Sequence, residues 1–524
     1  MTDPVSLRPF AALLPGIVAA LPILLCRRRP NLREGVTFLA GAVQLAAAVS
    51  MLPATLDGAA VTTPEIALLP GVALQFRADA LGLLFLILSS VLWLATSAYS
   101  VGYMRSLKYG HQTGYFAAFA VAAASAAGIA LAANLVTFLI CYEILTVSTW
   151  PLVLHLRKPR VLASGRAYLA YTLFAGQLLL GAVVWTAALA PGAGFTPGGF
   201  LAGSASDGAL RVLFVLFLVG VGAKAAVFPL HGWLPAAMVA PTPVSALLHA
   251  VAVVKAGAFG MLRITGWVFG PDLMWALDLA LPLALLAGGT ILFASLRAMT
   301  EDHLKRRLAY STVSQLSYIV LGGAIGSPLA LAGAAFHIAA HGFLKITLFF
   351  CAGSVYAATG KDRISQLGGL GRIMPITFAA FAVGALGMAG FPFLPGFLSK
   401  WNLGLGGMDS GQHWVAALLA TSGALNLAYY FPVLKTAVFE GSPAPRLPYG
   451  RTIVRAEELP PRPRLIEPTP WLWAPPVFAA AAALVLGLFP DFGPGFWSLA
   501  EAAAASVTDG ARDLTALYRG GPSR

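Results

Sequence analysis

Long apolar segments separated by short polar loops dominate this chain. A helix needs about 20 mainly apolar residues to cross a bilayer. Fourteen segments approach that length, so the pattern predicts an all-α polytopic membrane protein. The expected spans lie near residues 9–26, 35–54, 80–104, 114–132, 135–154, 167–190, 210–229, 243–263, 274–296, 308–324, 328–357, 374–401, 413–438 and 471–489.

The composition supports a membrane protein and excludes an ordinary soluble domain. Of the 524 residues, 58% are hydrophobic and 10% are charged, whereas soluble proteins carry about 25% charged residues. The three cysteines suggest neither a disulfide framework nor a metal cluster, and the sequence holds no nucleotide-binding motif. We therefore expect no cofactor, no metal and no catalytic residue in this chain.

The net charge of +13 has a topological explanation. With the N-terminus outside, alternation of the loops places 22 of the 34 lysines and arginines on the inner side and seven on the outer side. Such an excess of positive charge is typical of cytoplasmic loops. The pattern predicts a protein of the cell inner membrane with a periplasmic N-terminus, and it gives no reason to expect a nucleic-acid partner.

The five remaining lysines lie inside apolar spans. A lysine at the bilayer centre costs about 2.5–3.5 kcal/mol, and Glu143 is the one deeply placed acid in the expected spans. Lysine can release its proton when it is desolvated, whereas arginine stays charged. We interpret one of these lysines as reaching the inner surface and the other four as a proton relay. The first is Lys435, and the four are Lys224, Lys255, Lys345 and Lys400.

Histidines extend the predicted relay. His337, His341 and Lys345 are spaced four residues apart, which places them on one face of a helix. His249 and Lys255 share the eighth expected span. Histidine exchanges protons near neutral pH, so these groups are candidates for proton transfer within the membrane.

Prolines interrupt two expected spans next to a lysine. Pro229 follows Lys224, and the sequence FPFLPG at 391–396 precedes Lys400. Interrupted helices occur in membranes only where they line a cavity or are buried in protein. The breaks are five spans apart, which predicts two inverted five-helix repeats (spans 4–8 and 9–13). The expected parts are three helices in 1–113, one proton-channel repeat each in 114–265 and 266–440, a proline-rich cytoplasmic loop in 441–470, and a final helix with a tail in 471–524.

Five segments carry a family resemblance. They are FLICYEILTVSTWPLVLH (138–155), KAAVFPLHGWLPAAMVAPTPVSALLHAVAVVKAG (224–257), HLKRRLAYSTVSQLSYIVLG (303–322), HIAAHGFLKITLFFCAGSV (337–355) and MAGFPFLPGFLSKW (388–401). In this order they resemble the antiporter-like proton-pumping family. That family includes membrane subunits of respiratory complex I, the A-type and D-type subunits of Mrp cation/proton antiporters, and relatives in membrane hydrogenases. The chain is most similar to the D-type Mrp subunits, and the resemblance covers about residues 80–440.

The resemblance implies a role for each matching residue. Glu143 and Lys224 are similar to the family's glutamate–lysine pair, and Lys255 to its central lysine. The 337–345 stripe matches the eleventh-helix relay, and Lys400 matches the terminal site on the broken twelfth helix. The implied function is proton translocation within a hetero-oligomeric antiporter that exchanges Na⁺ or K⁺ for H⁺. Its implied partners are other membrane subunits of that assembly and the lipid bilayer.

Other functions remain open on the sequence alone. A proton-pumping subunit of a complex I-like NADH–quinone oxidoreductase or a membrane hydrogenase shares these motifs, although one complex I subunit type has glutamate where this chain has Lys400. A haem-bearing membrane anchor needs ligands on opposite sides of the iron, whereas His337 and His341 share one helix face. A passive scaffold does not explain four buried lysines.

Overall fold

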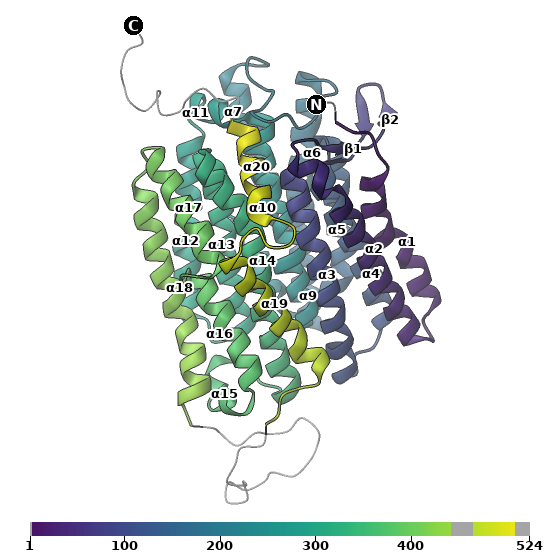
Figure 1. Cartoon of the computed structure of the whole chain (residues 1–524), viewed down its shortest axis with the longest axis vertical. Coiled ribbons are helices and arrows are strands. Elements are labelled where there is room, and N and C mark those ends of the chain that lie inside the picture. Colours follow the sequence, from purple (N-terminus) through teal and green to yellow (C-terminus); the bar gives the residue numbers. More distant parts are fainter. Residues whose placement is uncertain (1–2, 442–464, 509–524) are drawn as a thin grey trace, which may run out of the picture.

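The structure is a computed structural model that describes residues 3–441 and 465–508. Long helices run side by side along the long axis of the molecule (Figure 1). Twelve of them are long and apolar enough to cross a membrane, which confirms the expected all-α polytopic fold. Most of the expected proline-rich loop and part of the expected tail, at 442–464 and 509–524, lie outside the described residues.

The first half of the chain contains seven helices of 18 or more residues, a loop with short strands, and a region of shorter helices. The helices are α1 (Arg8–Leu25), α2 (Pro30–Leu56), α3 (Ala80–Ser106), α4 (Gln112–Leu131), α5 (Leu135–Val153), α6 (Pro159–Leu189), α7 (Asp207–Lys224), α8 (Trp233–Ala236), η1 (Ala237–Val239), α9 (Thr242–Ala246), η2 (Leu247–Val251), α10 (Val253–Arg263) and η3 (Ile264–Phe269). Strands β1 (Val61–Thr62) and β4 (Arg77–Ala78) pair antiparallel, as do β2 (Ile66–Leu69) and β3 (Val72–Leu74).

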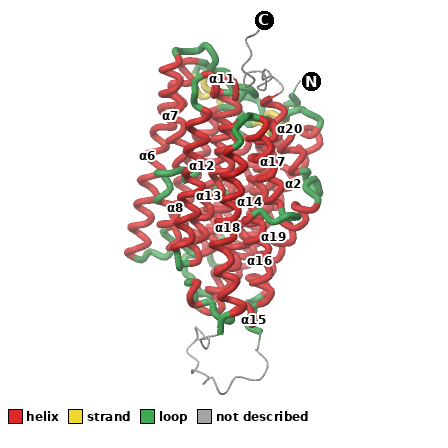
Figure 2. The backbone as a smooth tube through the Cα atoms, turned by 90° about the vertical axis from the view of Figure 1, so that its left-hand side faces the viewer, coloured by secondary structure: helices red, strands yellow, loops and turns green. Residues whose placement is uncertain are grey.

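The second half is arranged around one long central helix. Its elements are α11 (Pro271–Ala276), α12 (Ala280–Thr300), α13 (Leu304–Ile325), α14 (Pro328–Thr359), η4 (Ile364–Gln366), α15 (Leu370–Ile373), α16 (Pro375–Ala389), α17 (Pro395–Asp409), α18 (Trp414–Phe439), α19 (Pro470–Leu488) and α20 (Phe496–Thr508). The side view shows α15 at the end of the bundle opposite the N-terminus (Figure 2). We call this the basic end, because Arg372 lies in α15, and Lys361 and Arg363 lie in the connection just before it.

The two expected spans that are not single membrane-crossing helices are those with proline breaks. The helix expected at 210–229 ends at Lys224, and the chain turns at Ala226, whose φ is +57°. The span expected at 374–401 is divided into α16 and α17. Gly390 and Phe393 between them have φ values of +92° and +67°. A left-handed φ cannot continue a right-handed helix, so both spans are broken as predicted.

Helix α14 and the segment from α9 to η3 form the interior of the bundle. The most apolar 18-residue stretch of each is completely buried within the protein. Ser327 caps α14 by accepting a hydrogen bond from the Ala330 amide at 3.4 Å, and Gly360 ends the helix at a φ of +71°. Residues on either segment therefore face other helices rather than lipid.

Three features of the fold differ from the sequence-based expectation. The segment from α9 to η3 contains two π-helical stretches, η2 and η3, whereas one helix was expected at 243–263. Helix α20 was not expected because its 13 residues are too few to cross a membrane; it is packed against α3 and α14. Arg263, which was counted among the outer-side residues, is 1% exposed and donates to Asp79 at 2.6 and 2.7 Å.

Candidate proton-transfer site

Four buried lysines are the central feature of the site. The exposed fraction is 0% for Lys224, Lys255 and Lys345 and 8% for Lys400. Among the described residues, none of the four forms an ion pair within 4.0 Å of a carboxylate, since the nine ion pairs found there involve other side chains. Each amine donates instead to carbonyl or hydroxyl oxygens, which solvate an ammonium group without neutralising its charge.

Lys224 ends helix α7 and points at helix α5. Its Nζ donates to the Tyr142 backbone carbonyl at 2.5 Å and lies 3.2 Å from the centre of the Tyr142 ring. The neighbouring Glu143 carboxylate is an electrostatic neighbour of Lys224, but the two do not form a direct ion pair in the described structure. The two residues of the predicted pair are thus close in space, but their charged groups do not touch.

Glu143 is partly exposed at membrane depth. Its Oε1 is buried and has no hydrogen-bond partner among the described residues. Gly176 of α6 makes room for the carboxylate, because a Cβ at that position would lie 2.5 Å from Oε1. On its other side Glu143 lines an apolar groove of about 510 Å³ between α1, α4 and α5. The carboxylate is therefore closely packed against α6 on one side and faces the groove on the other.

Lys255 links helix α10 to the central helix α14. Its Nζ donates to the Ile338 carbonyl of α14. Helix α10 also lies directly against the end of α7, because a Cβ at Gly257 would be 2.1 Å from the Ala225 nitrogen. The glycine thus allows the backbone that carries Lys255 to approach the backbone just after Lys224.

The histidines lie around this central lysine. His341 has His249, Lys255, His337 and Lys345 as electrostatic neighbours. Both ring nitrogens of His249 and of His341 are buried without a hydrogen-bond partner among the described residues. A buried nitrogen without a hydrogen-bond partner costs free energy.

His337, His341 and Lys345 lie along helix α14, and two of them contact side chains of the helices packed around it. The rings of His337 and His341 have centroids 6.0 Å apart, and His337 Nδ1 lies 2.8 Å from Ser399 Oγ of α17. Lys345 donates to Ser311 Oγ, and at 3.2 Å each to the Leu308 carbonyl and the Tyr430 hydroxyl.

Lys400 lies just after the break between α16 and α17. Its Nζ donates to the Met388 carbonyl at 2.6 Å and lies 5.0 Å from the centre of the Tyr318 ring. Asn426 donates to the same carbonyl at 3.1 Å. The break thus supplies the acceptor, because Met388 belongs to the last turn of α16, where carbonyls lack intrahelical partners.

The groups that bind the lysines were not predicted from the sequence. Tyr142, Ser311 and Tyr430 supply oxygens to Lys224 and Lys345, and Ser399 contacts His337. The signal available was the run of polar residues STVSQLSY at 311–318 within an apolar span, which is buried along its whole length. Lys435 Nζ lies 3.8 Å from Glu440 Oε1, and its side chain is 57% exposed.

Comparisons with known proteins show which family this chain resembles. Residues 132–425 match the family described as NADH:quinone oxidoreductase/Mrp antiporter, TM. NADH-quinone oxidoreductase subunit N of Desulforudis audaxviator is 33% identical over 414 residues, which are 78% of this chain and 80% of that protein. A probable K(+)/H(+) antiporter subunit of Rhizobium meliloti, designated A/B, is 32% identical over 485 residues, which are 87% of this chain and 45% of that protein. The chain thus spans about half the length of some of its relatives.

Solved structures share the fold along nearly the whole chain. A chain of the Mrp complex from Dietzia sp. is 26% identical with a TM-score of 0.83, and the match covers 96% of this chain and 98% of that one. A chain of respiratory complex I from Thermus thermophilus has the same fold, with 22% identity, a TM-score of 0.70 and coverage of 92% and 98%. The sequence match, the relatives and the buried lysines agree, and this chain belongs to the NADH:quinone oxidoreductase/Mrp antiporter family of multi-pass membrane proteins.

Proposed function

We propose that the chain is the proton-translocating membrane subunit of a hetero-oligomeric antiporter that exchanges Na⁺ or K⁺ for H⁺. The observation that carries the proposal is the row of buried amines and imidazoles whose hydrogen bonds go to neutral oxygens. Such groups can gain or lose a proton without breaking an ion pair. Structural ion pairing would instead bring acids and bases together in similar numbers.

The proposed relay starts from the Glu143–Lys224 pair and continues through Lys255 with His249. It then follows the 337–345 stripe, which is His337, His341 and Lys345, and it ends at Lys400. Movement of Glu143 away from Lys224 would destabilise the ammonium and release its proton to the next group. A proton that arrives at Lys345 repels the charge on Lys400, which is its electrostatic neighbour. This repulsion would give the transfer a direction.

The antiporter function is supported by likeness to a chain of an Mrp complex over 96% of this chain, and by relatives that are named as K⁺/H⁺ or Na⁺/H⁺ antiporter subunits. The second candidate is a proton-pumping subunit of a complex I-like oxidoreductase or a membrane hydrogenase, supported by the likeness to subunit N. In both cases the partners are other membrane subunits. We further propose a place in the cell inner membrane, a periplasmic N-terminus, and the two repeats at 114–265 and 266–440.

The test is ion-driven proton movement by the intact assembly. The chain would be produced with its native partner subunits in a host without antiporters, and proton flux in inverted membrane vesicles would be followed with a pH-sensitive dye. We expect Na⁺ or K⁺ to drive the flux without NADH, and Lys255→Met to abolish it. Proton movement that occurs only during NADH oxidation would instead establish the second candidate. Identification of the co-purified subunits provides an independent check.

A further inference from the structure

One ion pair joins the segment that carries Lys255 to helix α3. Arg263, the last residue of α10, donates to the two carboxylate oxygens of Asp79 at 2.6 and 2.7 Å. Its side chain is 1% exposed, the lowest value for a cation in any ion pair of the described part of the chain. The carboxylate also accepts from the Gly82 amide at 2.8 Å and so caps α3. Arg263 therefore ties the end of α10 to the start of α3.

Three aromatic rings lie close to the same guanidinium. Its Cζ lies 4.9 Å from the centre of the Trp267 ring, 5.0 Å from that of Phe259 and 5.3 Å from that of Phe195. A cation is attracted to the face of an aromatic ring, and a guanidinium forms two parallel hydrogen bonds with a carboxylate only in a defined orientation. These contacts together hold the Arg263 side chain in one position.

The backbone that follows Arg263 is held as well. Carbonyls of the π-helical stretch η3 accept hydrogen bonds from amides of the 196–200 loop. They are Gly266, which accepts from Gly198 at 3.0 Å, Trp267, which accepts from Thr196 at 3.2 Å, and Val268, which accepts from Phe200 at 3.1 Å. The end of the segment that lies away from the basic end is thus fixed through both its backbone and a side chain.

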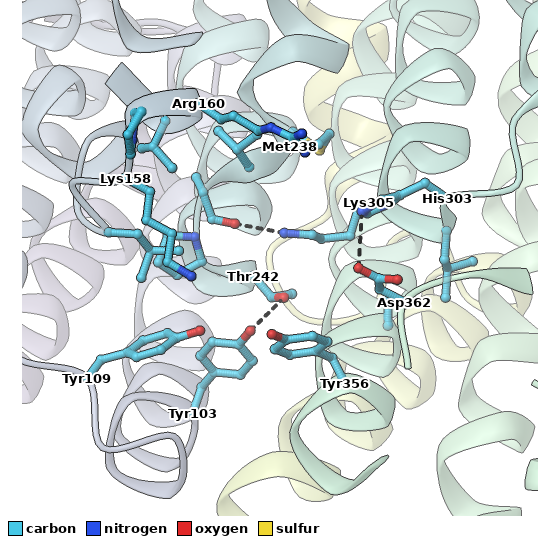
Figure 3. A pocket seen from close by; sticks show the side chains of 18 residues that line it. Tyr103, Tyr109, Lys158, Arg160, Met238, Thr242, His303, Lys305, Tyr356 and Asp362 are labelled. Carbon is cyan, nitrogen blue, oxygen red and sulfur yellow. Dashed lines mark hydrogen bonds and ion pairs between the residues drawn. The ribbon is translucent and has the colours of Figure 1, made fainter. Parts of the chain in front are cut away.

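The other end of the segment borders open space. Helix α9 begins at Thr242 in the wall of a cavity of about 660 Å³ at the basic end, and Figure 3 shows this threonine among the polar side chains of the cavity. Between η2 and α10, Ala252 has a φ of −122° and a ψ of −75°, which lie outside the helical region. Helical geometry is therefore not continuous from α9 to α10, and the end that carries Arg263 sets the place of α10.

Lys255 lies on the same short helix as Arg263. Helix α10 has 11 residues, and the Lys255 amine donates to the Ile338 carbonyl of α14. A helix rises 1.5 Å per residue, so the two side chains are separated by about 12 Å along the helix axis. A shift of the fixed end would therefore move the amine. A displacement of about 1 Å at a reacting group can lower a rate by about a hundredfold.

We propose that Arg263 is a positioning residue of the relay, which holds the Lys255 amine at the Ile338 carbonyl through its ion pair with Asp79. Arg263 does not carry the proton itself, because a guanidinium stays charged. The inference rests on the proposed proton transfer through Lys255, and it adds the residues that keep this lysine in place.

The two partners of the ion pair can be removed separately or together. Arg263→Gln leaves a carboxylate that is 21% exposed, lines a cavity of about 250 Å³ and has Arg77 as an electrostatic neighbour, so we expect this complex to assemble. Asp79→Asn keeps a side chain that can cap α3, but it leaves the buried guanidinium without its counter-charge, which is strongly destabilising. The double variant removes both charges and leaves neither unpaired.

The experiment measures cation-driven proton flux in inverted vesicles over a range of pH, with assembly judged on native gels. We expect Arg263→Gln and the double variant to assemble and to lower the flux by about a hundredfold. The flux that remains should reach half its maximum at a lower pH, because an ammonium that loses its carbonyl acceptor gives up its proton more readily. The two variants should have nearly equal effects, since residues that act as one unit are not additive.

Two control variants change nearby residues that do not touch Asp79. Thr265→Val removes a buried hydroxyl of η3 that donates to the Met261 carbonyl at 3.0 Å. Arg211→Gln removes an arginine from an exposed ion pair with Asp278 at 3.7 Å. Both controls should keep the flux and the pH profile of the wild type.

The possible outcomes separate this inference from the proposed function. Wild-type flux and pH profile in Arg263→Gln or in the double variant would overturn the positioning role. A lower flux with an unchanged pH profile, or failure of both variants to assemble, would assign the ion pair to stability alone and overturn it too. Lys255→Met is measured beside them, and wild-type flux in that variant would instead contradict the proposed relay.

Discussion

Lys345→Met removes an ammonium group while keeping an unbranched side chain of similar length. Lysine at this place donates to the Leu308 carbonyl, the Ser311 hydroxyl and the Tyr430 hydroxyl. After the change each of these acceptors still has a hydrogen-bond partner. Ser311 and Tyr430 bond to each other at 2.6 Å, and the Leu308 carbonyl still accepts from Thr312 Oγ1 at 3.0 Å.

The expected change in stability is small because two contributions oppose each other. Removal of the buried amine relieves an insertion cost of about 2.5–3.5 kcal/mol. It also removes the hydrogen bonds of the amine, which offset part of that cost in the wild type. Replacing buried charges by apolar groups is often neutral or stabilising. We therefore expect the free energy of unfolding to change by less than about 2 kcal/mol.

The expected change in transport is large. Without a group that binds a proton at position 345, cation-driven proton flux in inverted vesicles should fall to the background. Lys345→Arg should fail as well, because arginine does not release its proton. Thermal unfolding of the purified complex would be measured on the same samples. Normal flux in Lys345→Met would remove this residue from the relay, and normal flux in Lys345→Arg would show that only charge is needed. A collapse in stability would mean that the ammonium has a structural role.

Three further predictions test other parts of the molecule. Glu143→Ala should abolish proton flux in an assembled complex, as judged on native gels, and Glu143→Asp should retain part of it; Gly176→Ala should lower flux, because its methyl group would displace the carboxylate. Lys400→Ala should block flux and Lys400→Glu should retain some, whereas wild-type flux in the alanine variant would place the terminal site elsewhere. Burial and the nearby His111 lower the pKa of His155 to about 4, so the unfolded chain binds more protons between about pH 4 and 6.5 and stability falls as the pH drops through that range. His155→Phe should keep the contact of the ring with Tyr115 and flatten this decline in thermal unfolding; an unchanged decline would contradict the assignment.

The sequence by itself determined the membrane fold and identified the lysines that lie inside apolar spans. Each span must satisfy its own backbone hydrogen bonds in lipid, so length and hydropathy identify a helix without knowledge of its neighbours. The same local logic located both broken helices, since Pro229 and the 391–396 segment cannot continue a helix wherever they lie. Lys224 and Lys400 stood out because a charge in an apolar span is costly in any fold.

Only the tertiary structure decided which groups meet. Lys224 bonds to the Tyr142 carbonyl, 82 residues away, and Lys345 to Tyr430, 85 residues away. No pattern along the chain encodes such partners, because they depend on how helices distant in sequence are packed. The irregular turns around His249 have the same origin, since a π-helical stretch of five residues is too short to show a period in the sequence. The sequence specifies which span carries a charged side chain, and the packing of the helices specifies which oxygens accept its hydrogen bonds.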